Sequence, residues 1–142
     1  MAEAVVDSNV LLGARLKRDQ NHERGGEIIR GMDAGELPRG RLTEYNLPEV
    51  LTPIEKRGGD GPALETLELI TESRGLDVHH TTGDDYTRGL AIYRQEEGIE
   101  VVDCIMVAYM RRVGLKYVYS FDDDFDRFAD ITRLDSATNP FA

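Results

Sequence analysis

The sequence has no tryptophan, one cysteine and three lysines among its 142 residues. Because a single cysteine cannot form an internal disulfide, Cys104, which lies among apolar residues of a predicted helix, is expected to be a buried and unreactive thiol. No apolar stretch approaches the roughly 20 residues that a membrane-spanning helix needs. The amino terminus, MAEAVVD, lacks the basic and then apolar pattern of a secretion signal. These absences predict a cytoplasmic protein with no membrane partner.

Several common functional motifs are absent as well. The chain has no P-loop, no G-x-G-x-x-G and no G-x-S-x-G. Its three histidines show no metal-ligand spacing such as H-x-x-x-H. We therefore expect the histidines to be structural or exposed, and any catalytic site to use other residue types.

Basic residues are few: 17 Lys and Arg against 27 Asp and Glu leave a formal net charge of −10. No basic patch indicates nucleic-acid binding from charge alone. An acidic surface poor in lysine is typical of halophilic proteins, and an ordinary acidic soluble domain explains the composition equally well. In about 1 M salt the Debye length is roughly 3 Å, so acidity does not exclude a phosphodiester substrate.

Apolar residues follow two periods along the chain. Steps of three and four predict helices, and alternation in runs rich in Val, Tyr and Phe predicts strands. The predicted strands are 3–6, 41–42, 76–79, 116–121 and 131–134, and the predicted helices start at Ser8 or cover 27–32, 43–57, 63–73, 83–97 and 101–113. Because strands alternate with helices, we expect an α/β fold that forms a single layered domain over residues 1–142.

Residues at the element boundaries refine this prediction. Thr82 is suited to cap the helix that follows it, Gly114 to end a helix, and GGDGP at 58–62 to form a turn. Asn46 and Pro48 mark the start of the helix predicted over 43–57. Pro53 falls inside a predicted helix, where proline costs about 3 kcal/mol. We therefore expect a kink or a break near Pro53.

Four acidic residues lie where predicted strands end or predicted helices begin. Asp7 and Asp122 directly follow strands, and Glu49 and Asp103 fall in the first turns of helices. Each has an ordinary structural explanation as a turn residue, a cap or a partner of the helix dipole. In a parallel sheet, however, strand carboxyl ends and the amino ends of the following helices share one edge. All four acids can therefore face one place.

Carboxylates that face one place repel one another. Two of them about 4 Å apart repel by roughly 4 kcal/mol at an effective dielectric constant of about 20. Mg²⁺ or Mn²⁺, which takes oxygen ligands, removes this repulsion and makes the site locally positive. The pattern favours a divalent metal site at which activated water attacks a phosphodiester.

Four segments, taken in order, resemble the PIN-domain nucleases, in particular the small VapC-like toxins of prokaryotic toxin–antitoxin pairs. The segments are VVDSNVLLG (5–13), LPEVL (47–51), VVDCIMVAYMRRVG (101–114) and YSFDDDFDRF (119–128). Their order and spacing cover nearly the whole chain. The resemblance implies a three-layer α/β/α fold with a central, mostly parallel sheet of four or five strands. It also implies a Mg²⁺-dependent endoribonuclease with an RNA substrate, an antitoxin partner and a homodimeric state.

The resemblance also implies roles for individual residues. The catalytic and metal-binding acids it implies are Asp7, Glu49, Asp103 and Asp122, with Asp124 as a further metal ligand. Ser8 and Ser120 match positions where the family has a small polar residue or a hydroxyl. Glu44 is a substitute candidate for Glu49, and Asp122 is preferred to Asp123 because of its position after the strand.

Two other functions stay open. An aspartate-nucleophile phosphatase also has an acid after its first strand, but it needs a second Asp two residues later, where this chain has Asn9. A catalytically weak module that keeps the fold and binds a partner is the other alternative. RNA cleavage and binding of Mg²⁺ or Mn²⁺ distinguish the three.

Overall fold

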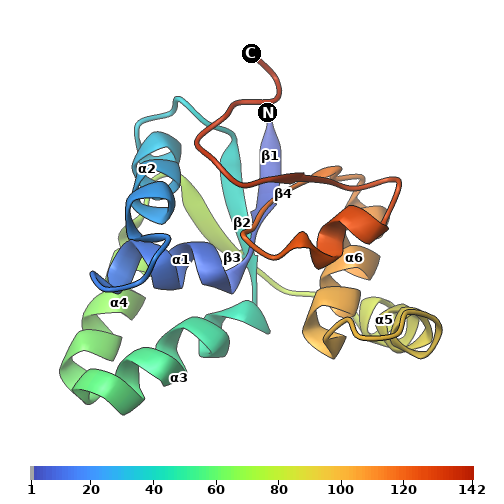
Figure 1. Ribbon diagram of the computed structural model, residues 1–142, viewed down its shortest axis with the longest axis horizontal. Coiled ribbons are helices and arrows are strands. Elements are labelled where there is room, and N and C mark those ends of the chain that lie inside the picture. Colours follow the sequence, from blue (N-terminus) through green and yellow to red (C-terminus); the bar gives the residue numbers. More distant parts are fainter. Residues whose placement is uncertain (1) are drawn as a thin grey trace.

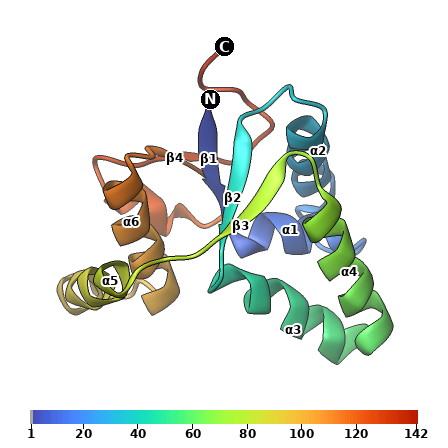
Figure 2. The ribbon, with the colours of Figure 1, turned by 180° about the vertical axis from the view of Figure 1, so that it is seen from behind.

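The computed structural model describes residues 2–142 as one five-stranded sheet with helices on both faces (Figures 1 and 2). Its strands are β1 (Glu3–Val6), β2 (Arg39–Thr43), β3 (Leu76–His79), β4 (Tyr117–Tyr119) and β5 (Thr132–Leu134). Their order across the sheet is β3-β2-β1-β4-β5, and every neighbouring pair is parallel. The predicted α/β fold class with a parallel central sheet is confirmed.

Six α-helices and one 3-10 helix connect the strands. They are α1 (Ser8–Arg15), α2 (His22–Asp33), α3 (Asn46–Gly58), α4 (Asp60–Glu72), α5 (Gly83–Gln95), α6 (Val101–Val113) and the 3-10 helix η1 (Asp123–Arg127). Figure 1 shows α1 to α4 on one side of the sheet and α5 and α6 on the other. In the described part of the chain, no helix combines the length and the apolar character needed to cross a membrane.

The central strand β1 separates two hydrophobic cores. Ala4 and Val6 belong to the core beneath α1 to α4, whereas Val5 belongs to the core beneath α6. Successive strand residues point to opposite faces, so a strand covered on both faces needs an unbroken apolar run. The run Ala4–Val6 meets this need, and Asp7 follows it at the edge of the sheet.

Two predicted signals at helix ends are confirmed. Thr82 caps α5 through a capping box, in which its side chain accepts from the backbone of Asp85 and the Asp85 side chain accepts from the backbone of Thr82. Gly114 ends α6 with a φ of 77°, which favours glycine. Cys104 is fully buried in α6, as predicted.

The helices α2 and α4 begin earlier than predicted. α2 starts at His22 and α4 at Asp60, so only Gly59 separates α3 from α4. Gly59 has a φ of 81°, a conformation that other residues rarely adopt. The turn predicted over residues 58–62 is therefore reduced to Gly59 alone.

The range predicted for α3 began too early, at Thr43, although Asn46, predicted to mark the start of this helix, is its first residue. Thr43 is the last residue of β2, where its hydroxyl donates to the Asn46 side chain at 2.6 Å, and α3 begins only at Asn46. Pro53 lies inside α3, and the helix continues through it to Gly58, so the chain does not break there. Because proline has no N–H, α3 lacks the backbone hydrogen bond that the Glu49 carbonyl would otherwise accept from residue 53.

α5 packs on α6 through a close contact at Gly89. A Cβ at this position would lie 2.6 Å from Cγ1 and 2.7 Å from Cα of Ile105. By contrast, a Cβ at Gly83, in the first turn of α5, would meet nothing within 4 Å.

Replacing Gly89 by Ala should therefore destabilise the fold, although alanine is the better helix former by about 1 kcal/mol. The clash involves backbone of α6, and such overpacking costs about 1–3 kcal/mol. We expect a lower midpoint in urea unfolding for G89A and an equal or higher midpoint for the matched control G83A. A midpoint for G89A above that of the wild type would contradict this packing.

Candidate metal centre

The carboxyl ends of β1 and β4 place two acids at one edge of the sheet. Val6 is in register with Tyr119, and the N–H of Asp7 donates to the Tyr119 carbonyl at 2.9 Å. Asp7 is the N-cap of α1 and Asp122 the N-cap of η1. Both residues thus have a local structural role in addition to their place at this edge.

Three aspartates at this edge come close together. Asp103, Asp122 and Asp124 each offer an oxygen that lies within 4.8 Å of the other two. Asp103 lies in the first turn of α6 and is only 6% exposed. Its side chain does not cap that helix, since the N-cap is Glu100 and no side-chain cap bond forms.

A second pair of acids lies on the α1 and α3 side. The Ser8 hydroxyl is 3.2 Å from Glu49 Oε1 and 3.4 Å from Asp7 Oδ1. The Asn46 side-chain amide donates to the same Glu49 oxygen at 3.1 Å. Glu49 is therefore held by side chains, and no side-chain capping bond forms at the start of α3.

Ser120 connects the two groups of acids. Its hydroxyl donates to Asp7 Oδ2 at 2.7 Å and accepts from the backbone N–H of Asp122 at 3.0 Å. The structure thus brings Asp7, Glu49, Asp103, Asp122 and Asp124 into one continuous cluster.

The two alternative acids point elsewhere. The Glu44 carboxylate accepts two hydrogen bonds from the backbone N–H of Thr81, at 2.8 and 3.0 Å. Asp123 is exposed and stands outside the group that Asp103 forms with Asp122 and Asp124. The geometry therefore favours Glu49 over Glu44, and it gives Asp124 a more central place than the sequence suggested.

Burial makes these carboxylates hard to ionise. Removal from water, followed by the charge of Asp7 and other acids, raises the pKa of Asp103 to about 8. The same loss of hydration is the main cause that raises the pKa of Asp7, only 4% exposed, to about 6. Loss of hydration also raises the pKa of Glu49 and of Asp124.

The five acids of the cluster form no ion pairs with basic residues in the described part of the chain, residues 2–142. Two carboxylate oxygens 4.8 Å apart repel by about 3 kcal/mol at an effective dielectric constant of about 20. A hard divalent cation, which prefers several oxygen ligands, fits this donor set.

Three polar residues near the acids were not assigned to the site from the sequence. Asn46 holds Glu49, Asn9 donates to Asp7 Oδ2 at 3.2 Å, and the charge of Glu100 raises the pKa of both Asp103 and Glu49. Their position in the sequence could have indicated them, because each lies within three residues of a predicted site acid.

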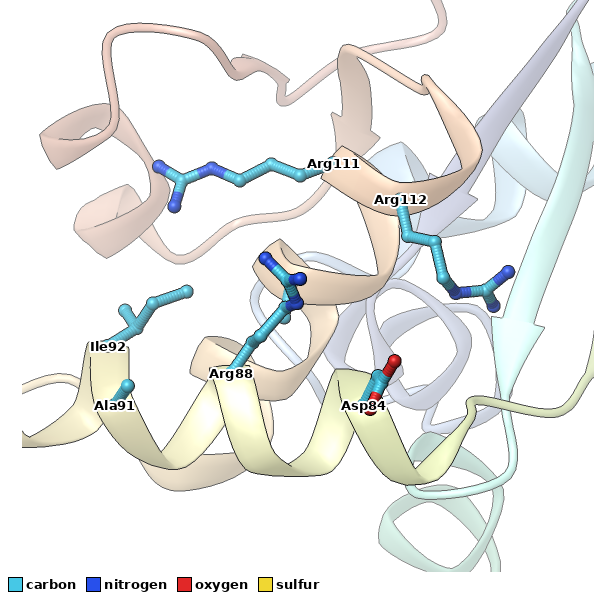
Figure 3. Close-up of a pocket in the computed structure, with 7 residues that line it drawn as sticks. Asp84, Arg88, Ala91, Ile92, Arg111 and Arg112 are labelled. Atoms are coloured by element: carbon cyan, nitrogen blue, oxygen red, sulfur yellow. The ribbon is translucent and has the colours of Figure 1, made fainter.

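A separate groove of about 530 Å³ lies between α5 and α6 (Figure 3). Arg88, Arg111 and Arg112 line it. Arg112 forms two hydrogen bonds to the buried Asp85 and Arg111 forms two to Asp130, so both guanidinium groups already have carboxylate partners. Asp84 also lines the groove. With its charges balanced in this way, the groove gives no indication of a catalytic centre.

Comparisons with known proteins support the predicted resemblance. The family model of the PIN domain matches residues 4–131. Among the curated proteins there is no match.

Solved structures of VapC toxins and toxin–antitoxin complexes have a similar fold. Mycobacterium tuberculosis VapC20, described as a sarcin-ricin loop cleaving toxin, aligns with a TM-score of 0.73 and 23% identity over 90% of this chain and 98% of its own. A chain of a Klebsiella pneumoniae toxin–antitoxin complex aligns with a TM-score of 0.68 and 17% identity, over 91% of this chain and 95% of its own. A chain of Rickettsia felis VapBC2 bound to a promoter DNA fragment aligns with a TM-score of 0.70 and 9% identity, over 93% of this chain and 97% of its own.

Without divalent metal, the protein should become less stable as the pH rises from about 4 to 8. The pKa of Asp103 is about 8 and that of Asp7 about 6 in the folded protein, against an ordinary value of 3.8. In this range the folded state holds protons that the unfolded state has released, so the free energy of unfolding falls with rising pH. Replacing Asp103 by Asn should raise the Tm by at least about 3 °C near pH 8.

Thermal melts in EDTA near pH 5 and pH 8 measure this effect. The gain for D103N should be smaller at the lower pH, because Asp103 is then protonated in the folded wild type. Asp84, an exposed acid outside the cluster, provides the control variant D84N with the same change in charge. An equal gain at both pH values would be evidence against the raised pKa.

Proposed function

The chain belongs to the PIN-domain family, and we propose on that basis that it is a metal-dependent endoribonuclease, the toxin of a toxin–antitoxin pair. The observation that supports this most strongly is the cluster of five carboxylates at one sheet edge, none of them paired with a basic residue among residues 2–142. A cluster of this kind costs folding energy, and binding of a positive ligand would offset that cost.

Mg²⁺ or Mn²⁺ is the proposed cofactor. Asp103, Asp122 and Asp124 would hold it, because their oxygens already lie within 4.8 Å of one another. Asp7 would contribute from the neighbouring position, since Ser120 joins it to Asp122. When bound, the ion supplies a water of lowered pKa and stabilises the charge that develops on the phosphodiester.

Glu49 is the acid best placed to handle a proton. Its Oε1 accepts from both Ser8 and Asn46, which orients the carboxylate and leaves Oε2 as the oxygen available to a water. The raised pKa of Glu49 makes it a better proton acceptor than an exposed glutamate. We propose that Glu49 orients the attacking water and takes up its proton at Oε2.

The two rival functions have less support. At the position where an aspartate-nucleophile phosphatase needs its second Asp, the Asn9 amide donates to Asp7 and Ser120. Asn9 is thus a hydrogen-bond donor where that chemistry needs an acid. A module that only binds a partner gains nothing from burying Asp7 and Asp103 without a cation.

An antitoxin is the proposed protein partner. The structural neighbours include chains solved within toxin–antitoxin complexes. On this chain, Leu64 and Leu69 of α4 are exposed, and Leu69 lines a groove of about 200 Å³ between α1, α2 and α4 together with Leu11 and Ile29. We propose that an apolar segment of the antitoxin binds at this groove, which Arg15, Arg30 and Asp33 also line. The homodimer, and the cytoplasmic location predicted from the sequence, remain predictions.

Replacing Asp7 by Asn should reduce cleavage of a fluorescent RNA in Mn²⁺ by at least about 100-fold, because a carboxylate needed for the charged centre is lost. The fold should stay intact or become slightly more stable, since one repelling charge is removed. The control D84N carries the same change in charge on α5 and should cleave within about twofold of the wild type. Unchanged cleavage by D7N would show that the site is wrongly assigned.

Removal of divalent metal should abolish cleavage, and Mg²⁺ or Mn²⁺ should restore it. Mn²⁺ at about 100 times its Kd should also raise the free energy of unfolding by about 2.7 kcal/mol, because it binds only the folded cluster. Cleavage assays after EDTA treatment and melts with and without Mn²⁺ measure both effects. Hydrolysis of small phosphate esters instead of RNA would favour a phosphatase, and metal binding without any hydrolysis would favour a partner-binding module.

A further inference from the structure

Asn9 makes three hydrogen bonds, one to the Asp7 cap of α1 and two that join the first turn of α1 to the end of β4. Its side-chain amide lies 3.2 Å from Asp7 Oδ2 and 3.3 Å from Ser120 Oγ, and its Oδ1 accepts from the backbone N–H of Phe121 at 3.2 Å. Resting on the proposed function, we infer that Asn9 is a positioning residue that leaves Asp7 Oδ1 as the one oxygen of Asp7 able to bind the metal.

The first step concerns the Ser120 hydroxyl. A hydroxyl donates one hydrogen bond and accepts two. Ser120 Oγ accepts from the Asn9 amide at 3.3 Å and from the Asp122 N–H at 3.0 Å, so both lone pairs are in use. Its only proton must therefore point to Asp7 Oδ2, which lies 2.7 Å away.

The second step concerns the Asp7 carboxylate. Oδ2 accepts from Ser120 at 2.7 Å and from Asn9 at 3.2 Å, which occupies its two lone pairs. Oδ1 accepts from the Ser8 N–H at 2.8 Å. The Ser8 hydroxyl has one proton and lies nearer to Glu49 than to Asp7 Oδ1, at 3.2 Å against 3.4 Å. Oδ1 therefore keeps a lone pair for a cation.

The third step concerns the loop that carries Asp122. The hydrogen bond from Phe121 N–H to Asn9 Oδ1 fixes the residue directly before Asp122. One side chain thus sets both the orientation of Asp7 and the position of the backbone that leads to Asp122, although more than 100 positions separate Asn9 from Phe121 in the sequence. Residues that orient metal ligands typically change metal affinity by about 10–100-fold when they are replaced.

The experiment measures Mn²⁺ affinity by titration calorimetry, and Tm with and without Mn²⁺, for the wild type, N9A and N9D. N9A removes all three hydrogen bonds and should weaken Mn²⁺ binding by about 10–100-fold. The control N139A removes a comparable pair of hydrogen bonds far from the cluster, to the Glu36 carbonyl and from the Phe141 N–H, each 2.9 Å long. It should leave the Mn²⁺ affinity unchanged.

N9D distinguishes positioning from charge. The carboxylate keeps the acceptor for the Phe121 N–H but loses the two donated bonds, and it draws the Ser120 proton away from Asp7. Positioning therefore predicts weaker Mn²⁺ binding by N9D than by the wild type. If added negative charge were all that mattered, N9D would bind Mn²⁺ more tightly, and that result would overturn the inference.

The remaining outcomes are also decisive. A lower Tm for N9A with an unchanged Mn²⁺ affinity would make Asn9 a purely structural residue and overturn the inference. If N9A does not fold, N9D alone decides, because it keeps the link to Phe121. A wild type that binds Mn²⁺ but cleaves no RNA would refute the proposed function while the affinities still test Asn9. A wild type that binds no Mn²⁺ would refute both.

Discussion

This structure is built around the mutual repulsion of buried carboxylates that form no ion pair with a basic residue within residues 2–142. Asp103 is 6% exposed and Asp7 4%, and both have a raised pKa. Such positions cost folding free energy, so apolar packing elsewhere must hold them. α6 shows how, because the helix that carries Asp103 in its first turn continues into fully buried Met106, Val107 and Met110. The acid is thus held at the edge of the sheet by the packing of its own helix.

The parallel sheet explains why acids far apart in the sequence meet. β1 and β4 are neighbours in register, so Asp7 and the segment 120–122 leave the sheet side by side. β2 lies on the other side of β1, and Thr43 at its end leads through Asn46 to Glu49. The groups that hold these acids in place are hydroxyls and amides. These neutral groups fix the positions of the carboxylates without neutralising their charge, so a cation would still stabilise the cluster.

The sequence allowed the positions of the acids to be predicted because backbone pattern determines them. A buried run such as Ala4–Val6 ends at a residue that must lie at the sheet edge, and the apolar stripe of α6 indicates that Asp103 lies in the first turn of its helix. Hydrogen bonds between side chains leave no such periodic signal, so the roles of Asn9 and Asn46 emerged only from the three-dimensional arrangement.

Predicted helix starts failed for a related reason. Polar or glycine-rich stretches at the start of α2 and α4 favour loops locally, whereas packing between helices makes them helical. A Cβ at Gly25 would lie 2.6 Å from the Val10 carbonyl oxygen, so glycine there allows α2 to approach α1 closely. At Thr43 the opposite error occurred, because pairing with β3 extends a strand into a segment with helical periodicity.

Pro53 makes the backbone hydrogen bonding around Glu49 differ from that around Asp103. Because proline has no N–H, the backbone carbonyl of Glu49 lacks the hydrogen bond that it would otherwise accept from the next turn of α3. Asp103, by contrast, lies on a helix with no proline and with its following turns packed against the sheet. Glu49 therefore depends more on its side-chain hydrogen bonds from Ser8 and Asn46 for its position, whereas Asp103 is placed by the packing of its own helix.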